Sequence, residues 1–112
     1  MDIVAQKEKK VDDGVHNGVI RTIRYREKPD FKFDYTDISI EMADGFIAKV
    51  SYPTFINPSS KLGLLLERFG CTITEGQSFD PEKILLEKKC QFQTTTEGKY
   101  YKVLTDSVKP TE

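Results

Sequence analysis

The sequence predicts a mostly-β domain whose elements follow the order β-β-β-α-β-β. Several runs alternate apolar and polar residues, which is the period-two pattern of half-buried strands. Only residues 60–69 clearly repeat their apolar side chains at helical spacing. The runs are short and are separated by Gly, Pro, Asn and Asp residues that favour turns. A chain of 112 residues has room for one such domain with one modest core.

The first strand is predicted at residues 15–26, which are rich in Val, Ile and Tyr. Gly18 inside this run predicts a bulge or a sharp bend, which would let a long first strand curl into a barrel. Pro29 and Asp30 end the run, because both residues favour turns over strands.

The second and third strands are predicted at residues 35–42 and 46–52, as a hairpin. Asp44 and Gly45 lie between the two alternating runs, and this pair is a strong signal for a tight turn. One face of the hairpin is apolar and the other is largely polar, so one side should cover the core. The predicted core-facing residues are Ile38, Ile40, Met42, Phe46, Ala48, Val50 and Tyr52.

The helix predicted at residues 60–69 carries a single apolar stripe. Ser59 or Ser60 can cap its beginning, and Gly70 can end it. Residues 80–85 start with Asp-Pro-Glu and predict a second, short turn of helix. The stripe consists of Leu62, Leu65, Leu66 and Phe69, at spacings i, i+3, i+4 and i+7.

The fourth and fifth strands are predicted at residues 89–95 and 99–108, joined by a turn at Glu97 and Gly98. A long first strand, and a helix in the connection between strands three and four, are typical of the OB-fold, a five-stranded and partly open barrel. The fold class predicted is therefore mostly β, with a five-stranded OB-fold-like barrel. Another small β-barrel, or an α+β roll with the same order of elements, is the alternative.

The domain is predicted to span residues 14–108, between a flexible N-terminal tail at 1–13 and a C-terminal tail at 109–112. No apolar run is long enough for a membrane span, and the first ten residues do not resemble a secretory leader. We therefore expect a cytoplasmic protein with no membrane partner. The sequence does not indicate an oligomeric state.

The charges nearly cancel, with 17 basic and 18 acidic residues. This balance argues against a protein that coats nucleic acid by charge alone. Basic residues are nevertheless concentrated in residues 21–32, and acidic residues in 34–44.

Cys71 and Cys90 are expected to be reduced thiols in the core, although the sequence does not exclude a disulfide. With His16 as the single histidine, we expect neither a metal site nor a cofactor. The common catalytic motifs, such as GxSxG, HExxH and the P-loop, do not occur. An enzyme is accordingly not expected.

Four segments resemble small OB-like proteins of phage and prophage replication modules and of uncharacterised prokaryotic operons. They are GVHNGVI at 14–20, NPSSKLGLLLERFG at 57–70, GQSFDPEKIL at 76–85 and CQFQ at 90–93. Where those proteins have Gly-Lys before the fourth strand, this chain has LEKK at 86–89. The resemblance covers residues 14–108 and consists of structural motifs. It implies non-catalytic binding of single-stranded nucleic acid, with DNA favoured over RNA.

An OB barrel presents its second and third strands, and the loops joining strands 1–2 and 4–5, to a nucleic-acid strand. Phosphates bind to Lys and Arg, and unstacked bases bind to aromatic faces. Both loops and their approaches contain these residue types. The predicted nucleic-acid-binding residues are Arg24, Tyr25, Arg26, Lys28, Phe31, Lys32, Phe33, Tyr35, Lys49, Lys99, Tyr100 and Lys102.

Other interpretations compete with this one. Phe31 and Phe33 could pack over a barrel end as ordinary core, and the basic run could be a solvated edge. Asp37 and Glu41 would repel phosphate at the centre of the surface, unless Lys49 pairs with one of them. The second hypothesis is a protein-interaction or assembly module with a protein partner, using exposed Ile47, Phe55 or the aromatic loop.

Overall fold

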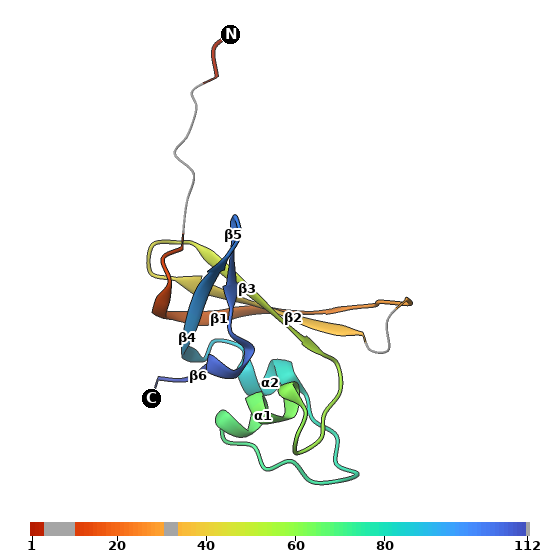
Figure 1. The fold of residues 1–112 in the computed structure, drawn as a ribbon. Coiled ribbons are helices and arrows are strands. Elements are labelled where there is room, and N and C mark those ends of the chain that lie inside the picture. The colour runs from red at the N-terminus through yellow and green to blue at the C-terminus, as the bar shows by residue number, and fades with distance from the viewer. Residues whose placement is uncertain (4–10, 31–33, 112) are drawn as a thin grey trace.

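The computed structural model describes residues 1–3, 11–30 and 34–111. It is mostly β, with an antiparallel sheet and helices packed at one end of it (Figure 1). No helix in the described ranges is long and apolar enough to cross a membrane. The elements are β1 (Gly14–Arg26), β2 (Tyr35–Met42), β3 (Ile47–Pro53), α1 (Lys61–Arg68), α2 (Pro81–Leu85), β4 (Lys89–Glu97), β5 (Tyr100–Val103), the 3-10 helix η1 (Thr105–Ser107) and β6 (Lys109–Pro110).

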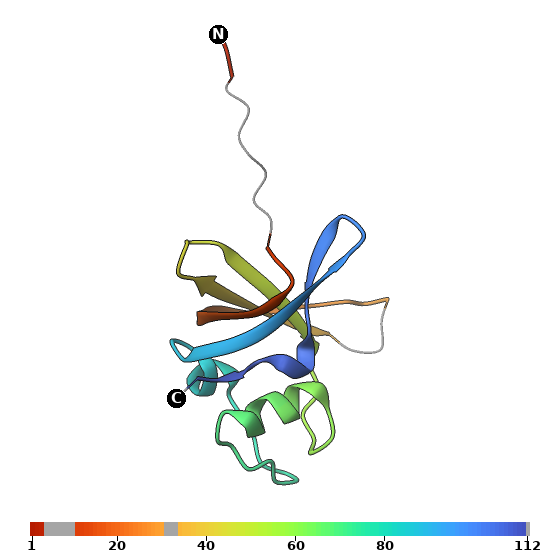
Figure 2. The same cartoon turned by 60° about the vertical axis from the view of Figure 1, so that its left-hand side comes forward.

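The long first strand, β1, pairs with two other strands along different parts of its length. Its residues 18–26 pair with β2, and its residues 14–19 pair with β4. The strand order is β3-β2-β1-β4-β5, with β6 added beside β4. The sheet curls so strongly that β5 approaches β3 (Figure 2).

The two ends of the curled sheet meet through side chains. No backbone ladder joins β3 to β5 within the described residues. Instead the backbone N–H of Lys49 donates to the hydroxyl oxygen of Tyr101 at 3.2 Å. The rings of Phe46 and Tyr101 lie edge to face with their centroids 5.6 Å apart. The sheet is therefore curled but not closed by strand pairing.

The bulge in β1 lies at Arg21, not at Gly18 as predicted. The pairing register with β2 shifts between Ile20 and Thr22, so one extra residue is accommodated there. Because of this shift, Ile20 and Ile23 both face the core although three positions separate them.

Gly18 is needed for a close approach of β1 to β2. A Cβ atom at this position would lie 2.6 Å from Cγ2 of Ile40 and 2.7 Å from the carbonyl oxygen of Glu41. Any larger residue would therefore push the two strands apart.

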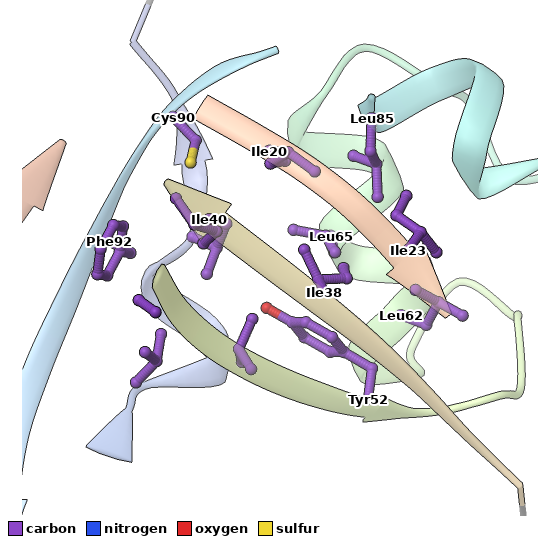
Figure 3. Packing of buried hydrophobic residues seen from close by; sticks show 14 of the residues in the cluster. Ile20, Ile23, Ile38, Ile40, Tyr52, Leu62, Leu65, Leu85, Cys90 and Phe92 are labelled. Carbon is purple, nitrogen blue, oxygen red and sulfur yellow. The ribbon is translucent and has the colours of Figure 1, made fainter. Parts of the chain in front are cut away.

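A single core fills the space between the sheet and α1 (Figure 3). The predicted apolar faces of the second strand, the third strand and the helix supply much of it. Met42, Phe46 and Phe69 pack at its margin as partly buried side chains. The largest fully buried side chains are Tyr52, Phe92, Ile20, Ile38, Ile40, Leu62, Leu65, Leu66 and Leu85.

The predicted helix and both of its caps are confirmed. Ser60 is the N-cap, and its hydroxyl oxygen accepts a hydrogen bond of 3.0 Å from the backbone N–H of Gly63. At the other end Gly70 has a positive φ of 98°. The N–H groups of Gly70 and Cys71 donate to the carbonyls of Glu67 and Leu66, which is the Schellman pattern.

The short second helix also begins as predicted. Asp80 caps α2 by accepting a hydrogen bond of 3.0 Å from the N–H of Glu82, and Pro81 is its first residue. The buried side chain of Leu85 ties this helix to the core.

The predicted fifth strand, residues 99–108, is wrong in its second half. The strand ends at Val103 and is followed by η1 and then by β6. The Tyr52 hydroxyl donates to the carbonyl of Thr105 at 2.8 Å, and Arg68 donates to the carbonyls of Thr105 and Val108 at 3.1 and 2.6 Å. These side chains take up backbone groups that a continuous strand would use in a ladder.

Parts of both predicted tail ranges contact the sheet. At the C-terminal end, Lys109 and Pro110 form β6 and pair with Gln91 and Cys90 of β4. In the N-terminal range 1–13, residues 4–10 lie outside the described residues. The hydroxyl of Thr94 donates to the Asp12 carbonyl at 2.7 Å.

Cys71 and Cys90 are both free thiols, as expected. Cys90 is fully buried, and Cys71 is partly buried beside the core.

Candidate functional site

The candidate site is the outer face of β1, β2 and β3. Strand side chains alternate between the two faces of a sheet, so residues that are directly opposite in register share a face. On the side away from the core the registers give three transverse rows. These rows are Thr22–Ser39–Lys49, Arg24–Asp37–Ser51 and Arg26–Tyr35–Pro53.

This outer face is hollowed into a groove of about 480 Å³. Short hydroxyl side chains line the groove, and long basic side chains stand among them, so space is left between the charges. The lining residues are Thr22, Arg24, Arg26, Asp37, Ser39, Lys49 and Ser51.

The acid at the centre of the groove is held by Arg26. Its Nε and one of its terminal nitrogens donate to the two carboxylate oxygens of Asp37, at 2.8 and 3.0 Å. The hydroxyl of Ser51 donates to the same carboxylate at 2.6 Å. The hydrogen bonds from Arg26 and Ser51 lower the pKa of Asp37, and they outweigh the opposing effect of its partial burial. Asp37 is therefore charged at neutral pH.

Arg26 also packs on an aromatic ring. Its guanidinium carbon lies 5.5 Å from the centre of the Tyr35 ring, within the range of a cation–π contact. The hydrogen bond that Arg26 donates to Asp37 raises the pKa of Arg26 above its ordinary value. The guanidinium is thus fixed between a carboxylate and a ring.

The second acid of β2 is paired outside the groove. Arg21 donates to a carboxylate oxygen of Glu41 at 3.2 Å and also to Glu87, which precedes β4. The hydrogen bond that Arg21 donates to Glu41 is the largest cause of the raised pKa of Arg21. Both acids of β2 are therefore compensated, but by arginines of β1 and not by Lys49.

Two basic side chains of the groove have no acidic partner. In the part of the chain that the structure describes, no ion pair involves Arg24 or Lys49. Both side chains are exposed, and they come from the two outer strands of the three. The groove therefore offers two separate positive charges to an anion.

The structure brings together four of the predicted site residues: Arg24, Arg26, Tyr35 and Lys49. Tyr25 belongs to the other face of β1. Burial raises the pKa of Tyr25, and the nearby acids Glu82 of α2 and Asp80, the cap of α2, raise it further. Tyr25 is therefore not part of the groove.

Other predicted residues lie around the groove or beyond what the structure describes. The backbone N–H of Lys28 donates to the side chain of Asp34 at 3.2 Å, in the connection between β1 and β2. The predicted residues Phe31, Lys32 and Phe33 lie outside the described residues.

The β4–β5 hairpin carries the remaining three predicted residues. Tyr100 is exposed over 78% of its surface, and Lys99 is exposed beside it. Lys102 lies 3.8 Å from a carboxylate oxygen of Glu97. In Figure 2 the tip of this hairpin (blue) points upward, whereas the C-terminal end of β1 (orange) extends to the right.

The hydroxyl residues of the groove were not among the predicted site residues. Thr22, Ser39 and Ser51 were not predicted, although alternation places Ser39 on the same face as Asp37. Their common signal is a short hydroxyl side chain two positions away from a charged residue on the same strand face. Such residues leave room for a ligand without repelling an anion.

A second hollow, of about 490 Å³, lies between the segment 56–58 and the segment 73–79. Its lining mixes the apolar Ile56, Ile73 and Phe79 with polar loop residues. Within the described ranges, no group of three His, Cys, Asp or Glu side chains is placed to hold a metal ion.

No protein-family model matches the chain, and the comparison with curated proteins finds no match. What the groove binds must therefore be inferred from its own geometry.

Proposed function

We propose that this chain binds single-stranded nucleic acid in the groove on β1, β2 and β3, with DNA as the favoured ligand, and that it does so without catalysis. The proposal includes the fold: a partly open five-stranded barrel of the OB type, extended by β6. The strand order, the shared first strand and the helix between β3 and β4 support this assignment.

The observation that carries the proposal is the position of Arg24 and Lys49 on opposite sides of a groove lined by small hydroxyl residues, with no ion pair to either among the described residues. Successive phosphates of an extended strand need separate positive charges along a channel. Hydroxyl groups between those charges can donate to phosphate oxygens. A nearly neutral chain that concentrates its free positive charge in a groove suits a localised contact better than general coating.

Two tyrosines, one beside the groove and one on the β4–β5 hairpin, can supply stacking surfaces for bases. Tyr35 lies in the third transverse row, and Tyr100 is the most exposed tyrosine of the β4–β5 hairpin. Stacking on a tyrosine is tolerant of base identity, because every base has an aromatic face. We therefore expect weak sequence preference.

The affinity should be modest and salt-dependent. Few phosphates can be contacted by the free charges of the groove, and Asp37 and Glu41 remain on the same face. Each phosphate contact to a single strand contributes a slope of about −0.7 to log K against log salt. A small total slope is therefore expected.

The test is fluorescence anisotropy of a labelled oligothymidylate of about 15 nucleotides, titrated at low and raised salt. The parent should bind with a dissociation constant of about micromolar at low salt. The double variant Arg24→Ala, Lys49→Ala should bind about tenfold more weakly and with a shallower salt slope. The control variant Lys61→Ala, Lys83→Ala removes the same charge from exposed positions of α1 and α2 and should bind like the parent.

Equal losses in the two double variants would contradict the groove as the site. Absence of binding by the parent at low salt would contradict the function, and the protein-interaction hypothesis would then replace it. Repeating the titration with oligouridylate ranks RNA against DNA, because the 2′-hydroxyl is the group that distinguishes them.

A further inference from the structure

Arg26 and Asp37 form a pair that does not fit a purely structural role. The side chains of Arg26 and Asp37 are 43% and 30% exposed, and ion pairs this exposed add little to stability. Both residues nevertheless line the groove, and the contact is bidentate. A bidentate arginine contact to a carboxylate has the same geometry as one to a phosphate.

We propose that Asp37 is an internal competitor for phosphate: its carboxylate occupies the anion-binding side of Arg26, and a nucleic-acid strand has to displace it to use that arginine. This inference rests on the proposed function, since it describes how the same groove is regulated. The groove thus offers the charges of Arg24 and Lys49 directly, and a third positive charge, on Arg26, becomes available when Asp37 is displaced.

The surroundings of the pair favour displacement over a permanent bridge. Ser51 donates to the Asp37 carboxylate and can keep it hydrogen-bonded after Arg26 leaves. The Tyr35 ring lies under the guanidinium and can keep Arg26 near the groove while its partner changes. Neither side chain would be left buried and unpaired, so exchange of one anion for the other carries a small penalty.

Glu41 provides a comparison on the same strand. It also faces outward from β2 and is also paired with an arginine of β1. It does not line the groove, and its partner Arg21 is bound to Glu87 as well. Removing the charge of Glu41 changes the net charge as much as removing that of Asp37, but it frees no arginine into the groove.

The experiment compares Asp37→Asn with Glu41→Gln by anisotropy of the labelled oligothymidylate across a salt series. Asp37→Asn should bind about fivefold more tightly than the parent, since it exchanges a weak internal pair for a phosphate contact. Its salt slope should steepen by about 0.7, the contribution of one further phosphate contact. Glu41→Gln should change the affinity by less than about twofold and leave the slope unchanged.

A double-mutant cycle then assigns the gain to Arg26. In an Arg26→Ala background, Asp37→Asn should tighten binding no more than Glu41→Gln does. Circular dichroism and thermal unfolding of each variant verify that the fold is retained.

The outcomes separate the two proposals. Tighter binding by Asp37→Asn with a steeper slope, dependent on Arg26, supports the internal competitor. Binding by the parent with equal effects of Asp37→Asn and Glu41→Gln overturns it and leaves the proposed function standing. Absence of binding by every variant at low salt overturns the proposed function, and the competitor with it.

Discussion

The hydroxyl oxygen of Tyr101 on β5 accepts a hydrogen bond of 3.2 Å from the backbone N–H of Lys49 on β3. This bond connects the two strand edges that the sheet leaves unpaired. It also fixes the backbone of a residue whose side chain lines the groove. One tyrosine hydroxyl therefore contributes both to holding the sheet in its curled form and to placing Lys49.

We expect Tyr101→Phe to lower the free energy of unfolding by about 1 kcal/mol, the net value of one hydrogen bond. The ring is kept, so its packing against Phe46 is retained. Tyr100→Phe is the matched control, because Tyr100 is 78% exposed, and it should change stability by less than about 0.5 kcal/mol. Urea unfolding measures both values, and equal values would contradict the role assigned to the Tyr101 hydroxyl.

Gly18→Ala should destabilise the fold by about 2 kcal/mol, through overpacking against Ile40 and the backbone of Glu41. The sign is informative, because Gly to Ala in an unobstructed strand normally stabilises. Asn17→Ala, at the exposed neighbouring position, should stay within about 0.5 kcal/mol of the parent. If Gly18→Ala leaves the free energy of unfolding unchanged in urea, β1 and β2 are not as close as the structure places them.

The stability of the protein should fall between about pH 9 and pH 11 because of Cys90. Burial raises the pKa of the Cys90 thiol from 9.0 to about 11. Below pH 9 the thiol is protonated in both states. As the pH rises through this window, the thiol ionises first in the unfolded chain, which favours unfolding. The expected loss is about 3 kcal/mol, with no further loss from this group above pH 11.

The corresponding variants isolate the contribution of that thiol. Cys90→Ala should lose about 1 kcal/mol at neutral pH, because a small cavity is left, and should show a flatter decline above pH 9. Cys71→Ala leaves Cys90 in place and should therefore keep the decline that the Cys90 thiol causes. Burial also raises the pKa of Tyr52, which adds a decline at higher pH in all three proteins. Identical slopes in Cys90→Ala and the parent would rule out the thiol as the cause.

The elements that sequence patterns predicted well are those determined by local chemistry. The caps of α1 depend on Ser60 and Gly70, which lie within one turn of the backbone groups that they satisfy. The β2–β3 hairpin depends on alternation and on the turn at Asp44 and Gly45, both of which are readable in the chain.

The missed features depend on partners far away in the sequence. The bulge at Arg21 follows from the register between β1 and β2, which alternation in one strand does not specify. The break after Val103 depends on Arg68 and Tyr52, which are supplied by α1 and β3. These two partners lie outside residues 99–108, so the pattern within that segment does not predict the break.

The same reason explains what was missed at the candidate site. The basic residues of the groove could be predicted because Lys and Arg are the residue types that bind phosphate, and Arg24, Arg26 and Lys49 were all predicted. The pairing of Asp37 with Arg26 was not predicted; Lys49 was considered as its partner, but the register places Ser51, not Lys49, directly opposite Asp37 on β3. Lys49 lies opposite Ser39, and Arg26 of β1 reaches Asp37 diagonally on the adjacent strand β2.

Arg68→Met should lower the free energy of unfolding by about 2 kcal/mol, because two carbonyls lose a charged donor while the apolar stem is kept. The amide proton of Thr111, which donates to the carbonyl of Lys89, should exchange faster in this variant. Amide exchange by NMR measures the effect, with Lys83→Met on the exposed face of α2 as the control. Unchanged exchange at Thr111 would mean that Arg68 does not hold the C-terminal strand.

The shared position of β1 has a consequence for the order in which the chain folds. Its pairing with β2 joins residues close in sequence, such as Arg26 and Tyr35. Its pairing with β4 brings together His16 and Thr94, which are 78 positions apart. Closing so long a loop costs more chain entropy and takes longer than forming a hairpin. We therefore expect the three strands of the groove to assemble early from nearby contacts, and the docking of β4 to set the folding rate.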